Sequence, residues 1–185
     1  HSIARGIAAA HLRPEHIEEL LIHPGTGGRA DRPDTYADTL ADFYNQSAER
    51  LAGHLEAGRD VALLVAGDPG VYSSFQHLHR RLRDRFRVEV VPGVTSATAA
   101  AAALQQPLCE ADESVALLSG ADSDLPALVH QVDSAAIYKL GPSLTEVKHS
   151  LGLAGRLSEA WYVERVTLDG EQIRYRGTDG NDYVT

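Results

Sequence analysis

The stretch that decides the fold is residues 61–74, VALLVAGDPGVYSS. Its first five residues form an uninterrupted apolar run, which is typical of a buried strand in a parallel sheet. Gly67-Asp68-Pro69-Gly70 then predicts a sharp turn, and a helix is expected to begin at Ser73 or Ser74 and to reach about Arg85. Glycine has no Cβ, so a ligand can approach the backbone of this first turn (residues 66–71) closely.

A second unit of the same kind follows it. Val88 to Val91 is the expected strand, Pro92-Gly93 opens the second turn (residues 92–95), and Thr95-Ser96 is expected to begin a helix. Free N–H groups at a helix start suit a carboxylate or another polar edge of a ligand. Simple capping of the helix by Thr95 or Ser96 would also explain why hydroxyl residues stand there. Two such turns at successive strand ends favour one shared ligand site.

Asp68 allows two interpretations. Its carboxylate could accept hydrogen bonds from the ribose or amino group of a ligand, or it could be an ordinary turn residue.

Strand-like and helix-like stretches alternate along the rest of the chain. Further helices are expected over 2–12, from a cap at Asp34 or Thr35 to Gly58, and over 96–103, 125–131 and 144–151; further strands are expected over 17–22, 115–118, 135–140, 161–166 and 172–175. The polar stretch 105–113 is the expected linker. The predicted fold class is therefore α/β, with two small α/β domains at 1–108 and 114–185 and ligand sites at the carboxyl ends of strands.

Composition excludes several classes of protein. The 185 residues include 17 Lys and Arg against 26 Asp and Glu, a net charge of −9, which argues against general nucleic-acid binding. No apolar run approaches the ~20 residues of a membrane span. A single cysteine, Cys109, allows no internal disulfide and indicates a reducing compartment. The chain contains no methionine and begins at His1 without a signal peptide, so we expect its natural N-terminus to be missing.

Two apparent motifs are given ordinary interpretations. No metal site is expected, because His77 and His79 do not share one face of a helix. The basic run 79–87, HRRLRDRFR, is interpreted as a solvated helix face instead of an anion-binding surface.

Five segments together resemble the tetrapyrrole (precorrin and corrin) methyltransferases of cobalamin biosynthesis, and most of all those that act on C20 of precorrin-2. They are Gly67-Asp68-Pro69, residues 72–86 (YSSFQHLHRRLRDRF), 88–96 (VEVVPGVTS), 137–141 (IYKLG) and 161–167 (WYVERVT). The likeness covers most of the chain in the family's order. It departs at the start, where the family's first strand and Gly-rich loop have no counterpart.

The resemblance implies S-adenosylmethionine-dependent C-methylation of precorrin-2 at C20, by a cytoplasmic homodimer that holds the cofactor in a cleft between two α/β domains. It assigns no catalytic residue and no metal. The cofactor-binding residues that it implies are Ala66, Gly67, Asp68, Val71, Thr95, Ser96, Tyr138, Val166 and Thr167.

Other functions stay open at this point. A sister methyltransferase could act on cobalt-precorrin-2, on a later precorrin or on a substrate that is not a tetrapyrrole, and a non-catalytic ligand-binding or interaction domain belongs to another class. A tetrapyrrole's carboxylates would need cationic partners, for which Arg5, Arg29, Arg32 and the basic run 79–87 are candidates.

Overall fold

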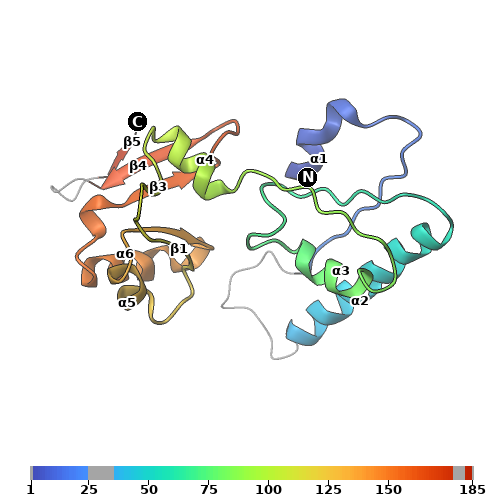
Figure 1. Ribbon diagram of the computed structural model, residues 1–185, viewed down its shortest axis with the longest axis horizontal. Helices are drawn as coiled ribbons and strands as arrows, with labels where there is room; N and C mark the ends of the chain where they lie inside the picture. The colour runs from blue at the N-terminus through green and yellow to red at the C-terminus, as the bar shows by residue number, and fades with distance from the viewer. Residues whose placement is uncertain (1, 25–35, 177–181, 185) are drawn as a thin grey trace. The chain divides into compact units, whose positions relative to one another are not determined.

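The structure, a computed structural model, describes residues 2–24, 36–176 and 182–184. The chain divides into two compact units, His1–Thr95 and Ser96–Thr185 (Figure 1). The division precedes the expected linker at 105–113, because helix α4 (Ser96–Ala103) belongs to the second unit. Within the described ranges, no helix has the length and apolar character needed to cross a membrane.

The first unit is built on helices. They are α1 (Ile3–Ala8), the 3₁₀ turn η1 (Ala9–His11), α2 (Tyr36–Glu56) and α3 (Phe75–Leu82). The expected helices over 2–12 and after residue 73 are confirmed with these bounds, whereas the expected cap at 34–35 lies outside the described residues.

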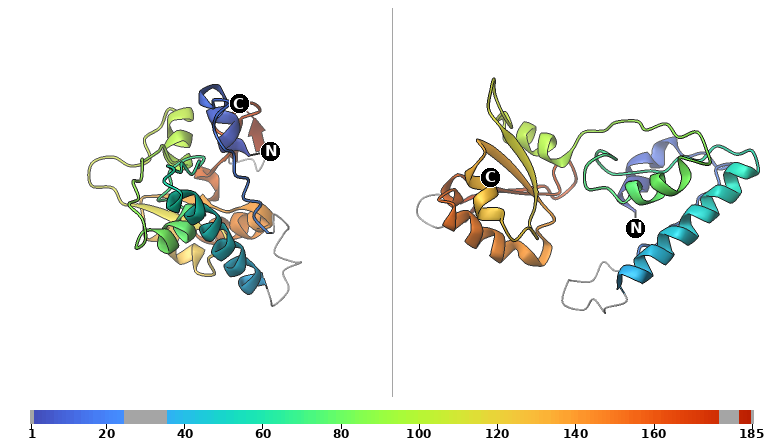
Figure 2. Two further views of the ribbon diagram at one scale, coloured as in Figure 1. Left: turned by 90° about the vertical axis from the view of Figure 1, so that its right-hand side faces the viewer. Right: turned by 60° about the horizontal axis from the view of Figure 1, so that its bottom comes forward.

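Helices α2 and α3 pack side by side and form the core of the first unit (Figures 1 and 2). The buried side chains of this core are Tyr44, Ala48, Leu51, Ala52, Leu78 and Leu82. Part of the basic run lies across this contact, since Arg85 binds Glu49 at 2.6 Å and Glu56 at 3.0 Å, and Arg81 donates to Asn45 Oδ1 at 2.8 Å. Two arginines of the run, Arg81 and Arg85, therefore bind side chains of α2.

Three strands expected in the first unit are absent from its described residues. Residues 17–22, 61–65 and 88–91 have no ladder partner, and Ile22 and Val91 are each 74% exposed. An apolar, β-branched run is a local signal, but a strand forms only when a neighbouring strand pairs with its N–H and C=O groups. The prediction of strands at these three places was wrong.

The second unit contains all the strands that the structure assigns among the described residues. Its elements after α4 are β1 (Val115–Ser119), α5 (Leu125–His130), β2 (Ser134–Tyr138), η3 (Gly141–Ser143), α6 (Leu144–Leu153), η4 (Leu157–Glu159), β3 (Trp161–Glu164), β4 (Gln172–Arg176) and β5 (Asp182–Val184). β1 and β2 pair in parallel through the α5 crossover, and β3, β4 and β5 form an antiparallel sheet. Leu125, Val129 and Val147 form the buried centre. The α/β class is confirmed for the chain as a whole.

Candidate functional site

The first and second turns of the first unit touch each other through Gly93. An ideal Cβ built on Gly93 would lie 2.3 Å from the carbonyl oxygen of Gly67 and 3.3 Å from the Cα of Asp68. A real Cβ essentially never approaches another atom so closely, so only glycine fits at position 93 while the turns stay in place. The two turns that the sequence singled out are therefore one structural feature.

Asp68 fastens the two turns together. One carboxylate oxygen accepts the N–H of Gly70 at 2.7 Å, and the other accepts the N–H of Gly93 at 2.8 Å. These bonds stabilise the charged form, so the N–H of Gly93, and then that of Gly70, holds the pKa of Asp68 below its usual value. Of the two interpretations of Asp68, the structure supports at least the turn residue, because both oxygens bind backbone.

The first turn is also held in shape by its own backbone and by α3. Gly67 has φ +83°, and Tyr72, just after the turn, has φ +49°. Both angles lie in the left-handed region, which residues other than glycine rarely adopt. Gln76 of α3 donates to the carbonyl oxygen of Pro69 at 2.9 Å. A Cβ on Gly67 would meet only the Val94 carbonyl oxygen, at 3.7 Å, so the space beside this backbone is open.

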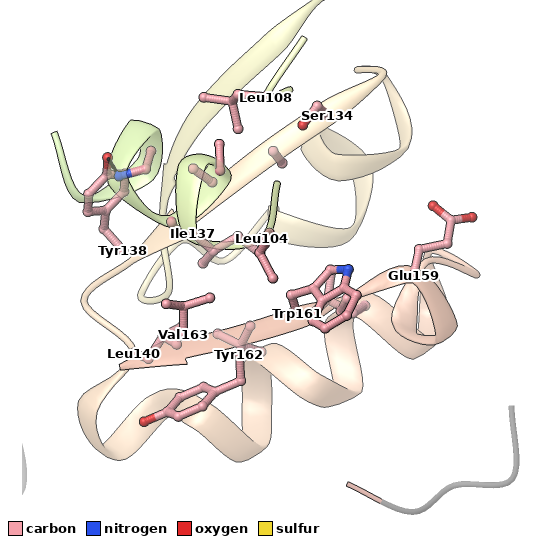
Figure 3. A pocket seen from close by; sticks show the side chains of 18 of the residues that line it. Leu104, Leu108, Ser134, Ile137, Tyr138, Leu140, Glu159, Trp161, Tyr162 and Val163 are labelled. Atoms are coloured by element: carbon pink, nitrogen blue, oxygen red, sulfur yellow. Dashed lines mark hydrogen bonds between the residues drawn. The ribbon is translucent and has the colours of Figure 1, made fainter. Parts of the chain in front are cut away.

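A cavity of about 520 Å³ lies inside the second unit (Figure 3). Ser96, Tyr138 and Val166, all implied by the resemblance, line it. In Figure 3 the side chains of Leu104 and Trp161 reach toward each other across it.

Tyr138, the last residue of β2, lines the cavity and contacts the start of α4. Its hydroxyl oxygen accepts the N–H of Ala97, in the first turn of α4, at 3.2 Å. This N–H has no intrahelical acceptor, because the first four N–H groups of a helix cannot bond within it. The hydroxyl of Tyr138 therefore fixes the start of the helix that the second turn leads into.

The two loops that leave β2 and β3 carry backbone strain. Lys139 has φ +61°, Arg165 +55° and Thr167 +64°. Strained residues of this kind persist only where the surroundings hold them, and they cluster at ligand sites. The N–H of Thr167 donates to Glu171 Oε2 at 2.7 Å, and Thr167 itself does not line the cavity.

The nine implied cofactor residues therefore fall into two groups, one in each unit. The first unit holds Ala66, Gly67, Asp68, Val71 and Thr95, and the second holds Ser96, Tyr138, Val166 and Thr167. That both groups bind one cofactor, in a cleft between the two domains, stays a prediction.

Sequence reasoning left two residues out of the site. Gly93 had a usable signal, because it follows a proline at the end of an apolar run, but its contact with Gly67 requires the three-dimensional structure. Arg174 in β4 also lines the cavity, and nothing in its local sequence marks it.

The expected cationic partners of a substrate are only partly described. Arg5 is paired with Glu18, its Nη2 lying 2.9 Å from Oε1. Arg29 and Arg32 lie outside the described residues.

Comparisons with known proteins agree on the family. Residues 4–180 match the family model of the tetrapyrrole (corrin/porphyrin) methylases. The cobalamin biosynthesis protein CobIJ of Mycobacterium bovis is 46% identical over 94% of this chain, and the precorrin-2 C(20)-methyltransferase of a Sinorhizobium species is 40% identical over 89% of it. The chain spans 34% of the length of the former and 68% of the latter.

A solved structure shares the fold. The crystallographic structure of the cobalt precorrin-4 methyltransferase CbiF superposes with a TM-score of 0.62 and 24% identity, covering 70% of this chain and 59% of that one. With the family model matched along nearly the whole sequence, this chain belongs to the tetrapyrrole methylase family.

Proposed function

We propose that this protein transfers the methyl group of S-adenosylmethionine to C20 of precorrin-2 in cobalamin biosynthesis. The observation that carries the proposal is the 40% identity, over 89% of this chain and 68% of the other, with a protein named for that reaction. Family membership alone supports methyl transfer to a tetrapyrrole, and this relative supports the particular carbon.

The residues present fit a cofactor of this type. Beside Gly67 the backbone is open to a ligand, and the Asp68 carboxylate holds the first and second turns in contact. In the second unit, the cavity presents the Ser96 and Tyr138 side chains among apolar ones. A ligand with a nucleoside and an amino-acid part needs such a mixture of backbone donors, hydroxyls and apolar walls.

The chemistry asks little of the protein beyond positioning. S-adenosylmethionine, when bound, supplies a methyl group already activated by its sulfonium, and the electron-rich macrocycle supplies the carbon nucleophile. The residues of the two turns and of the cavity would hold the partners within about 3–3.5 Å and in line, which by itself lowers the barrier. No triad or metal is needed for this step.

A second candidate substrate is the cobalt complex of precorrin-2. A Salmonella typhimurium protein named cobalt-precorrin-2 C(20)-methyltransferase is 32% identical over 70% of this chain. The same binding residues would serve either substrate, because the metal sits at the centre of the macrocycle and the methylated carbon at its edge. Higher identity over more of the chain favours the metal-free substrate.

The test is a methylation assay read by mass spectrometry. The full-length protein is incubated with S-adenosylmethionine and either precorrin-2 or cobalt-precorrin-2. We expect precorrin-2 to gain the mass of one methyl group faster than its cobalt complex. Faster methylation of the cobalt complex would make it the favoured substrate in place of precorrin-2. No mass gain with either substrate would overturn the proposal.

We also propose a cytoplasmic homodimer, as the resemblance implies. Sedimentation analysis of the purified protein tests the assembly.

A further inference from the structure

Arg174 lies in the middle of β4, directly opposite Tyr162 of β3, and lines the cavity of the second unit. Its Nη2 donates to Gln172 Oε1 at 2.6 Å. Its Nε is buried and has no hydrogen-bond partner among the residues that the structure describes. This one N–H of the guanidinium is therefore removed from water without an acceptor.

Such an arrangement is costly in the protein without a ligand. A buried N–H that has lost its water and found no acceptor destabilises the state in which it occurs, and it does so more when the donor is charged. An acceptor brought by a ligand removes that cost, so the site favours the liganded state.

The other charges around the cavity point to an anionic group. Lys148, Arg156 and Arg165 line it together with Arg174, against one carboxylate, that of Glu159. Arg156 is already bound to Glu159 at 2.7 Å and to the carbonyl oxygen of Asp133 at 2.9 Å, and Lys148 also interacts with another group. Among the residues that the structure describes, the side chain of the exposed Arg165 has no polar partner and that of Arg174 is bound only through Nη2, so these two remain for a ligand.

Most of the remaining lining is apolar. Ala100, Ile137, Leu140 and Val147 are among these residues. A ligand that suits this cavity has an apolar body and at least one anionic group.

We propose that Arg174 binds a carboxylate of a ligand in this cavity, through its Nε edge. A guanidinium edge offers two parallel N–H donors to the two oxygens of a carboxylate, which is a strong and geometrically selective pairing. The inference rests on the proposed function, and both reactants of that function bear carboxylates: the amino-acid end of S-adenosylmethionine and the acidic side chains of the tetrapyrrole.

The experiment compares Arg174→Gln and Arg174→Lys with the wild type and with Arg13→Gln. Arg13 is an exposed arginine of the first unit and does not line the cavity, so its replacement removes the same charge without changing the lining. Calorimetry measures the affinity for S-adenosylhomocysteine and for its decarboxylated analogue, and steady-state kinetics measure KM and kcat for precorrin-2. Circular dichroism confirms that each variant is folded.

Two results support the inference and separate the sources of the carboxylate. If the cofactor supplies it, Arg174→Gln weakens S-adenosylhomocysteine binding by about tenfold or more and leaves the decarboxylated analogue unchanged. If the tetrapyrrole supplies it, cofactor affinity is unchanged and KM for precorrin-2 rises by about tenfold or more with kcat retained. Arg174→Lys keeps the charge but not the planar set of N–H donors. Its cofactor affinity or its KM for precorrin-2 should therefore lie between the values of the wild type and of Arg174→Gln.

The contrary results are also distinct. A folded Arg174→Gln protein with the affinities and KM of Arg13→Gln would overturn the role of Arg174 and leave the proposed function standing. A wild type that binds neither reactant would overturn the proposed function and the ligand assumed here with it. If Arg174→Gln does not fold, the same comparisons made with Arg174→Lys decide the question.

Discussion

The N–H of Gly93 donates to the carboxylate of Asp68 at 2.8 Å across 25 residues of chain. The same glycine lies so close to Gly67 that a Cβ would reach within 2.3 Å of its carbonyl oxygen. Two turns that look alike in sequence, each a glycine bend before a helix, are thus held together as a single surface of backbone and one carboxylate.

We expect Gly93→Ala to push the two turns apart. Because the added Cβ would overlap backbone atoms, the turns must shift, and S-adenosylhomocysteine affinity should fall by about tenfold or more. The matched control is Gly53→Ala within α2, where a Cβ meets nothing within 4 Å. Alanine is the better helix former by up to about 1 kcal/mol, so the control should be as stable as the wild type or more so. Calorimetry on both variants makes the comparison, and unchanged affinity in Gly93→Ala would refute the site.

The contribution of Asp68 to stability should depend on pH. Its pKa in the folded protein is lowered by the N–H groups of Gly93 and Gly70, so its contribution is fully present above its unfolded pKa of about 3.9 and is lost as pH falls through the lower folded value. Asp68→Asn keeps only one good acceptor for these two donors. Urea unfolding of both proteins should show a stability difference at neutral pH that shrinks below about pH 4. A difference that stays constant down to full protonation would contradict the assigned bonds.

Tyr138→Phe should destabilise the second unit. The substitution removes the acceptor of the Ala97 N–H at the start of α4, and a net loss of about 1 kcal/mol is typical for such a bond. Tyr162→Phe is the control, since the hydroxyl of Tyr162 donates to the exposed Glu164 carboxylate at 2.9 Å and should cost less. Thermal unfolding of the two variants separates them. Equal losses of stability in the two variants would mean that the bond from the Ala97 N–H to Tyr138 stabilises the unit no more than the exposed bond of Tyr162 does.

Neutralising Arg80, Arg81 and Arg83 together should leave turnover within about tenfold of the wild type. Arg81 binds Asn45 of α2 and the carbonyl oxygen of His77, so the triple glutamine variant should unfold at a somewhat lower temperature. A larger loss of turnover in a folded variant would show that the basic run 79–87 docks the substrate and that its interpretation as a helix face is wrong.

Helices and the parallel pair of strands in the second unit could be predicted because their signals are local. The periodic apolar residues of α2 and the strand–helix–strand order from Val115 to Tyr138 are present within each segment. The three expected strands of the first unit depend on partners elsewhere in the chain, which no local pattern supplies.

In the candidate site too, local features could be predicted and contacts between distant residues could not. Asp68 was found because a carboxylate in a glycine turn is conspicuous, whereas the second of its donors, the N–H of Gly93, belongs to another turn. Arg174 in β4 looks like any solvent-facing strand residue in sequence, and its buried Nε is visible only in the folded unit.

The position of the new methyl group tests the account most directly. The full-length protein is incubated with precorrin-2 and S-adenosylmethionine labelled with ¹³C in its methyl group, and the product is examined by ¹³C NMR. The account predicts a single enriched methyl signal, correlated with C20 of the macrocycle, and a weaker signal after the same reaction time when Gly93→Ala replaces the wild type. A methyl group on another ring carbon, or no enriched product from the wild-type protein, would contradict it.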